Sequence, residues 1–337
     1  VYKRQNTDRK AIQDEIDQLT TEIDRVSETT KFNETYLLKG DGAEKAHNVN
    51  AHDAGLDGVT LTDKGDTVDV TLKTLNAGDK VSIAGKNYTI GATAADAQKI
   101  VDAQKVDGKT VTVNGTTYTY KTNQWTNADG SAATVGGGAA GSITIKGGDV
   151  VSDGTKTLTA MKDGADAAGA DGIDDNDSTV ITAGKAYQLQ TAEIVKASSI
   201  GTDTAAAVKN GANADKDATA TFTLNKGTVS YKDALSFNLH VGADADMTNK
   251  ITVNIDSMNS AGLGVKGIKA DTEQDATYAI DAIADAISTV SSQRSSLGAV
   301  QNRLEHTINN LDNVVENTTS AESRIRDTDM AEEMVNY

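Results

Sequence analysis

Residues 280–311 read IDAIADAISTVSSQRSSLGAVQNRLEHTINNL, and this stretch decides the fold. With Ile280 as heptad position a, one heptad frame runs on to Ile325, in a region with no Pro and a single Gly, Gly298. The a positions are Ile280, Ile287, Arg294, Gln301, Ile308, Val315 and Glu322; the d positions are Ile283, Val290, Leu297, Leu304, Leu311, Thr318 and Ile325. A 3.5-residue period sustained this long predicts a helix that packs along another helix. At about 1.5 Å per residue, a helix from Ala276 to Tyr337 would span roughly 90 Å, so it needs partners.

The N-terminal segment repeats this period, since its apolar residues are spaced alternately by four and three. We therefore expect both ends to pack together as a long helical rod, an antiparallel, coiled-coil-like bundle. The predicted core seam consists of Ile12, Ile16, Leu19, Ile23, Val26, Ile283, Val290, Leu297, Leu304, Ile308 and Leu311. The polar a positions Arg294 and Gln301 have two interpretations: buried groups that fix the register, or groups at the edge of a slightly rotated seam.

The composition changes between residues 41 and 235, where Gly, Asp, Thr, Ala and Val are abundant and short alternating strands recur. Residues 81–90 and 111–120 match each other as two hairpins, and residues 94–106 form a predicted helix between them. Residues 126–180 predict loops and short strands. Strands at 235–241 and 251–255 form a further hairpin just before the long helix.

The expected fold class is therefore α+β, with a β-rich domain inserted between helical ends. We expect three segments. Residues 1–40 are the N-terminal part of a helical core domain, residues 41–235 are the inserted outer domain, and residues 236–337 are the C-terminal part of the core, with the β-hairpin and the long helix. An insertion of this size must carry its own hydrophobic core.

The charge and composition exclude several classes of function. The 337 residues carry a net charge of −17, which argues against nucleic-acid binding, because phosphates would be repelled. The absence of Cys excludes disulfides and thiolate catalysis. No run of eighteen apolar residues occurs, so the sequence predicts no transmembrane helix and no membrane partner.

The sequence contains no convincing catalytic, cofactor or metal site. His47 and His52 lie in a polar stretch without enough further ligands for zinc. The run from Gly136 to Gly141 fits G-x-G-x-x-G but precedes a strand-like segment instead of the helix that a phosphate loop needs. The acidic run 171–177 lacks the spacing of a calcium loop, and we interpret it as a solvated loop. The chain is therefore not expected to be an enzyme.

Both ends resemble a known family. Residues 291–311 and 321–334 closely resemble the C-terminal core helix of bacterial flagellin. Residues 12–16, 22–27 and 30–33 resemble the flagellin N-terminal core, and residues 242–246 and 254–258 resemble the hairpin packed on that core. The middle of the chain matches only as the variable insertion that such proteins carry.

The resemblance implies a structural subunit of the extracellular flagellar filament, which polymerises into a helical tube for swimming motility. It implies other flagellin subunits, an export chaperone and the filament cap as partners. Arg324, Arg326, Asp327 and Asp329 are candidate subunit contacts, and Ile12 and Glu15 match part of the surface seen by Toll-like receptor 5. Measured against the family, the chain is expected to be a fragment lacking the terminal polymerising helices.

A second interpretation comes from another class of protein: a surface adhesin or carbohydrate-binding module carried on a helical stalk. The scarcity of aromatic residues argues against it, because sugar faces commonly stack on aromatic rings and the chain has a single Trp, Trp125.

Overall fold

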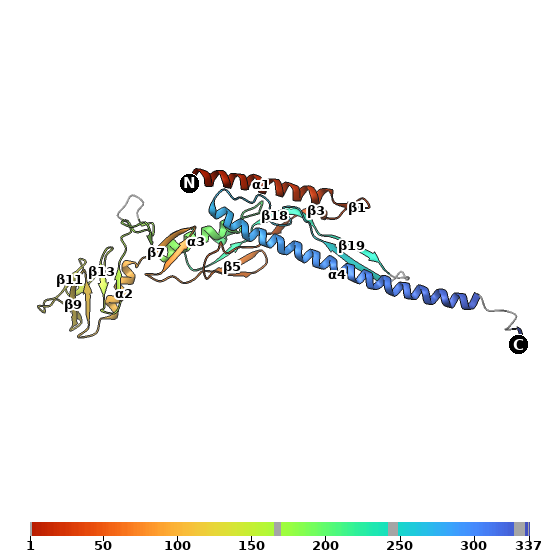
Figure 1. Ribbon diagram of the computed structural model, residues 1–337. Helices are drawn as coiled ribbons and strands as arrows, with labels where there is room; N and C mark the ends of the chain where they lie inside the picture. The colour runs from red at the N-terminus through yellow and green to blue at the C-terminus, as the bar shows by residue number, and fades with distance from the viewer. Residues whose placement is uncertain (1, 165–169, 242–248, 327–333, 336) are drawn as a thin grey trace. The chain divides into compact units, whose positions relative to one another are not determined.

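The computed structural model describes residues 2–164, 170–241, 249–326, 334, 335 and 337 (Figure 1). The chain divides into two compact units. Unit 1 comprises Val1–Lys10, Asn48–Thr228 and Ile268–Ala279, and unit 2 comprises Ala11–His47, Val229–Gly267 and Ile280–Tyr337. Helices and strands occur in both, which confirms the predicted α+β class.

Unit 2 contains the C-terminal part of α1 (Tyr2–Thr29), most of α4 (Glu273–Arg326) and three strand pairs. The pairs are β1 (Lys31–Phe32) with β2 (Thr35–Tyr36), β3 (Asp41–Asn48) with β18 (Thr228–Asp233), and β19 (Leu235–His240) with β20 (Lys250–Ile255). α4 is one continuous helix of 54 residues. The absence of Pro allows this length, and Thr272 caps the first turn by accepting the Asp275 N–H at 3.0 Å.

The hairpin β19–β20 covers one face of α4. Ile251, Val253 and Ile255 alternate with exposed residues along β20 and are buried. On α4, Gln293 is buried; its Nε2 donates to the Asn254 carbonyl at 2.9 Å, and its Oε1 accepts the Asp256 N–H at 3.3 Å. The half-buried residues Val290, Leu297, Val300 and Leu304 continue this face along the helix. The face of α4 that packs against the hairpin is therefore formed by heptad positions d and g.

α1 is held near its C-terminus by polar contacts. The Asp24 carboxylate accepts the backbone N–H of Ser260 at 2.7 Å and its hydroxyl at 2.9 Å. Ser27 is buried and donates its hydroxyl to the Leu38 carbonyl at 2.8 Å. The first contact attaches α1 to the segment that follows β20, and the second attaches it to the segment that follows β2.

The predicted antiparallel coiled-coil rod is not shown by the structure. Ile12, Leu19, Val26, Ile283, Ile308 and Leu311 are exposed, and the remaining residues of the predicted seam, Ile16, Ile23, Val290, Leu297 and Leu304, are half-buried. The physical reason lies in α4, whose covered face is built on Ala282, Ala286 and Gln293 and meets a β-hairpin. Small and polar residues do not register in a heptad pattern of large apolar side chains.

The first core of unit 1 is formed by two sheets and α3 (Ala183–Ala197). One sheet has the order β16 (Ala207–Val208), β17 (Thr221–Asn225), β5 (Thr67–Thr71), β4 (Thr60–Asp63). The other has the order β15 (Val180–Ile181), β7 (Lys86–Ile90), β6 (Lys80–Ile83). Val70, Leu224, Ile181 and Ile194 are fully buried between them. A short 3-10 helix, η1 (Lys209–Gly211), follows β16.

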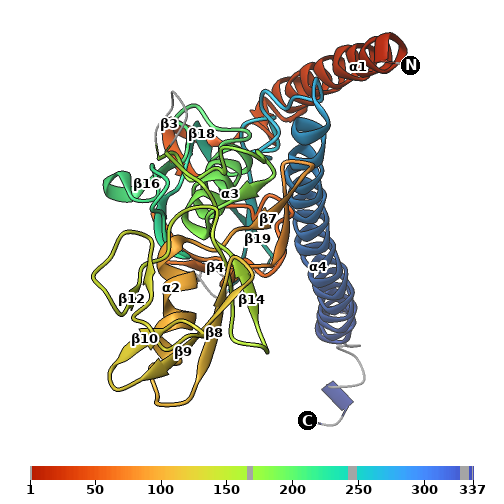
Figure 2. The same ribbon diagram turned by 90° about the vertical axis from the view of Figure 1, so that its left-hand side faces the viewer.

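The second core of unit 1 lies between α2 (Ala94–Ala103) and a five-stranded sheet (Figure 2). The sheet order is β10 (Gln124–Thr126), β9 (Thr116–Lys121), β8 (Thr110–Val113), β13 (Val150–Ser152), β14 (Thr157–Thr159). Strands β11 (Thr134–Val135) and β12 (Ser142–Ile143) pair in parallel beside it. Trp125 is buried here, and its ring forms a T-shaped pair with that of Tyr120, with centroids 5.1 Å apart.

The predicted hairpin repeat is confirmed, and the structure adds a third copy. β6–β7 and β8–β9 flank α2, and β13–β14 repeats the same pattern of hydrogen bonds. In each copy a Gly with positive φ donates its N–H across the hairpin: Gly78 to Ile90, Gly108 to Tyr120 and Gly148 to Ala160, at 2.8, 2.8 and 2.6 Å. The third copy escaped the sequence comparison because its strands are shorter and its turn has four residues between the paired strands, instead of two as in the other copies.

Candidate functional site

The most distinctive surface of unit 2 is an exposed apolar stripe on α4. Ile280, Ile287 and Val315, all at heptad position a, are 64%, 62% and 61% exposed. Ile308, Leu311 and Ile325 are exposed as well and continue the a and d series. Large apolar residues repeated on one helix face and left uncovered mark a surface for another protein.

α1 carries a shorter stripe of the same kind. Ile12 and Leu19, seven residues apart, are 51% and 56% exposed, and Val26 follows after another seven. Glu15, which was predicted with Ile12 as a receptor surface, is also exposed. The side chains of Ile12 and Glu15 are thus open to a partner.

The polar heptad positions lie outside the covered face. Arg294 and Gln301 are exposed, and Gln301 donates to Glu305 one turn further on, at 3.0 Å. They are therefore not buried groups that fix a register; they lie in the same exposed a series as Ile287 and Ile308. Among the predicted subunit contacts, Arg324 and Arg326 are exposed near the end of α4, and Arg326 lies 3.7 Å from Glu322. Asp327 and Asp329 lie outside the described residues.

The structure assigns loop or stacking roles to the polar residues weighed as metal or phosphate ligands. His47 stacks on Tyr231 with ring centroids 4.0 Å apart, and His52 hydrogen-bonds through its backbone to Ser198. The run 136–141 links β11 to the strand β12. Within the described residues, no group of three or more His, Cys, Asp or Glu side chains could hold a metal ion.

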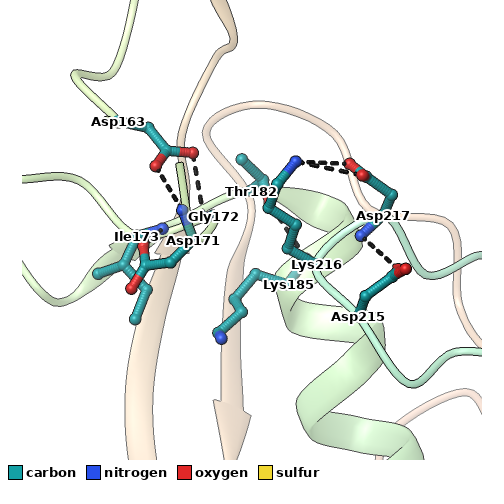
Figure 3. Close-up of polar contacts among 9 residues, drawn as sticks. All are labelled: Asp163, Asp171, Gly172, Ile173, Thr182, Lys185, Asp215, Lys216 and Asp217. Carbon is teal, nitrogen blue, oxygen red and sulfur yellow. Dashed lines mark hydrogen bonds and ion pairs between the residues drawn. The ribbon is translucent and has the colours of Figure 1, made fainter. Parts of the chain in front are cut away.

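Unit 1 contains a cleft of about 800 Å³ at the start of α3 (Figure 3). The Asp163 carboxylate accepts the backbone N–H groups of Asp171 and Gly172, at 2.8 and 3.0 Å. The Lys216 ammonium lies 3.1 Å from both carboxylate oxygens of Asp217. These charged groups are thus occupied in holding loops, and the drawn residues show no pairing of a nucleophile with a base.

A buried polar contact that the sequence did not reveal lies at the start of α4, within unit 1. Tyr278 is 5% exposed and donates its hydroxyl to Glu193 of α3, which is also buried. Lys196 pairs with the second oxygen of Glu193 at 2.7 Å. Burial, reinforced by the hydrogen bond to Glu193 and its charge, raises the pKa of Tyr278 well above its usual range. The contact anchors the first turns of α4 on α3.

No helix within the described ranges has the length and apolar character needed to cross a membrane.

Long helices with uncovered apolar stripes are typical of a structural protein that assembles with other proteins. Comparisons with known proteins agree. The family model for the bacterial flagellin N-terminal helical region matches residues 3–43, and that for the bacterial flagellin C-terminal helical region matches residues 280–337.

Individual relatives support the same family. The chain is 33% identical to a flagellin of Clostridium tyrobutyricum, across 98% of this chain and 67% of the relative. It is 29% identical to flagellin C of Vibrio cholerae serotype O1, across 97% of this chain and 63% of the relative. A flagellar filament 31.3 kDa core protein of Treponema maltophilum is 42% identical across 29% of this chain and 36% of the relative. The chain thus spans between 36% and 67% of the length of these relatives.

The chain therefore belongs to the bacterial flagellin family, whose members are structural subunits of the flagellar filament and not enzymes, and its function is a structural one of this kind. The alternative of an adhesin or carbohydrate-binding module is not favoured. The prediction of a fragment without the terminal helical regions is not borne out, because both family models match this chain.

Proposed function

We propose that subunits of this protein polymerise through the exposed stripes of α1 and α4. The observation that carries the proposal is the row of a and d residues on α4 that the hairpin β19–β20 leaves uncovered, including Ile287, Ile308 and Val315. Burying one such side chain contributes about 1.5–3 kcal/mol, so a few of them offset the entropy lost on association. Head-to-tail contacts that do not close into a ring produce an open helical polymer.

We propose the following division of labour along the chain. Residues 1–40 and 236–337 supply the helical core of the filament, and residues 41–235 form the outer domain exposed on the extracellular surface. The repeated hairpins and the two apolar cores of the middle region support an outer domain that folds on cores of its own. The net charge of −17 favours solubility of such a surface.

The remaining partners of this chain are proposed from its resemblance to flagellins. They are an export chaperone, the filament cap and Toll-like receptor 5, with Ile12 and Glu15 as the receptor surface. Arg324, Arg326, Asp327 and Asp329 are proposed as contacts to neighbouring subunits. The exposure of Ile12, Glu15, Arg324 and Arg326 supports these assignments.

Substitution within the stripe tests the polymerisation surface. Ile308→Asp and Val315→Asp place a charge where the proposal requires apolar burial, whereas Asn310→Asp adds the same charge on another exposed face of α4. Seeded polymerisation, followed by sedimentation and electron microscopy, should show strong loss of filaments for the first two variants and near-normal filaments for the third. Far-UV circular dichroism checks that the helix is retained. Normal filaments from Ile308→Asp and Val315→Asp would overturn the proposal.

A further inference from the structure

The sequence contains two Asn–Gly pairs, Asn114–Gly115 and Asn210–Gly211, and unit 1 holds them in different ways. Both Asn residues adopt positive φ values, 50° for Asn114 and 59° for Asn210. In such a pair the Gly backbone nitrogen can attack the Asn side-chain carbonyl carbon, because Gly has no side chain that restricts its backbone. The surroundings of each Asn amide decide whether this attack takes place.

The amide of Asn114 is fixed on both of its polar atoms. This residue forms the tight turn between β8 and β9, and its Oδ1 accepts the Val150 N–H at 2.8 Å. Its Nδ2 donates to an Asp149 carboxylate oxygen at 2.9 Å, and its backbone N–H donates to the Val150 carbonyl. The carbonyl carbon and the amide group that would leave are therefore held against β13.

The amide of Asn210 has no comparable restraint. Asn210 is exposed in η1 with ψ at 22°, and in the described part of the chain its side chain makes no hydrogen bond. A Cβ added to Gly211 would meet no atom within 4 Å. The nearby anchor is Asn213, whose Nδ2 donates to Thr191 Oγ1 at 3.1 Å and to the Thr219 carbonyl at 2.8 Å. The loop is thus fastened at Asn213, while the Asn210 amide is left open to water.

We propose that Asn210 is a site of spontaneous deamidation, a chemical modification of the outer surface of unit 1. The Gly211 nitrogen forms a bond to Cγ of Asn210, and the bond from Cγ to Nδ2 breaks. The amide group leaves as ammonia, taking up the proton lost by the Gly211 N–H, and a five-membered succinimide remains. Water then adds to one ring carbonyl and opens the ring to aspartate or isoaspartate. The reaction consumes one water and needs no oxidant, cofactor or enzyme.

The geometry favours Asn210 strongly over Asn114. Attack requires rotation about ψ of the Asn so that the following nitrogen turns toward Cγ. At Asn210 this rotation opens a single 3-10 turn, whereas at Asn114 it breaks the β8–β9 turn and two side-chain hydrogen bonds. Misorientation of reacting groups changes rates by orders of magnitude, so Asn210 should react at least about tenfold faster.

The product differs from the parent chain in charge. Each event adds one negative charge to an exposed loop, and isoaspartate also lengthens the backbone by one carbon between β16 and Asn213. Because hydrolysis of the amide is effectively irreversible in water, the converted fraction records the time since the chain folded. Deamidation at Asn210 does not depend on how the subunits polymerise.

Timed peptide mapping tests the proposal. The purified full chain is incubated at neutral pH, and aliquots are digested and analysed by mass spectrometry for the peptides that contain residues 114 and 210. Conversion at Asn210 should exceed that at Asn114 by about tenfold or more in the folded chain. In concentrated urea the two rates should converge, because both pairs then lack their folded surroundings. Equal rates in the folded chain, or faster conversion at Asn114, would overturn the proposal.

Two variants sharpen the test. Asn210→Gln replaces the five-membered ring by a less favourable six-membered one. On ion-exchange chromatography, the folded variant should therefore lose most of the gradual gain in negative charge, here called the charge drift, that the original chain shows during incubation. Asp149→Ala removes the partner of Asn114 Nδ2 and should raise conversion at that residue. An Asn210→Gln chain that drifts in charge as fast as the original would contradict the assignment to Asn210.

Discussion

At the scale of single residues, the two matched turns of unit 1 differ in how well their residues suit the backbone. Ala84 and Gly85 have φ values of 55° and 74°, and Asn114 and Gly115 have 50° and 82°. Both turns need two residues with positive φ, a requirement that Asn–Gly meets best. We expect Ala84→Asn to raise the free energy of unfolding by about 0.5–1 kcal/mol, because Asn tolerates the left-handed region better than Ala.

The equivalent turn supplies the control for this prediction. Asn114→Ala removes a residue suited to positive φ together with its bonds to Asp149 and Val150, and should lower the free energy of unfolding by about 1–3 kcal/mol. Urea unfolding of both variants measures the two effects. A destabilising Ala84→Asn would show that the first turn is constrained by something other than its backbone angles.

The raised pKa of Tyr278 leads to a prediction about how the stability of the folded chain depends on pH. Its raised pKa means that the folded chain keeps a phenolic proton that the unfolded chain releases near pH 10. The stability contributed by this tyrosine is therefore complete below about pH 10 and falls as the pH rises further. Thermal melts of the original chain and of Tyr278→Phe should show a shallower alkaline decline in the variant. Identical declines would indicate that Tyr278 titrates equally in both states.

At the scale of elements, the sequence predicted three hairpins but missed the hairpin β13–β14 and the helix α3. β7, β9 and β20 were visible because their apolar residues alternate with polar ones. α3 was missed because its buried face includes Gln190, Thr191 and Glu193, which interrupt an apolar helical period. Its capping residue, Thr182, was the available signal, since its hydroxyl accepts the Lys185 N–H. A search for apolar periodicity does not detect charged and amide side chains that are buried together with hydrogen-bonding partners.

The face of α4 was mispredicted for a related reason, and this leads to a test. Gln293 joins α4 to β20 through Asn254 and to the residue after this strand, Asp256, whereas Gln301 on the same helix is exposed. Gln293→Ala should therefore lower the free energy of unfolding by about 1–3 kcal/mol and increase hydrogen exchange in β20. Gln301→Ala is the matched control and should change stability by less than about 0.5 kcal/mol. Equal effects of the two substitutions would contradict the packing of α4 on the hairpin.

At the scale of the whole molecule, the candidate surface was predictable in its residues but not in its partner. The a and d residues of α4 were recognised from their spacing, and most of those on the a series are exposed. A heptad pattern reports that a helix face needs burial, but it does not report whether the cover comes from the same chain. The apolar residues on α4 that the hairpin leaves open are the ones proposed here to meet another subunit.

The net charge of −17 adds a prediction about assembly that belongs to the whole chain. Subunits of the same charge repel one another, and added salt shortens the range of that repulsion from about 30 Å at 0.01 M to about 8 Å at 0.15 M. Because the proposed contacts are apolar, polymerisation should become faster and more complete over this range, as measured by sedimentation and light scattering. Sucrose at matched osmolality controls for solute effects other than screening. A steady fall in polymerisation with salt would show that ion pairs, such as those proposed for Arg324 and Arg326, outweigh both the general repulsion and the apolar stripe.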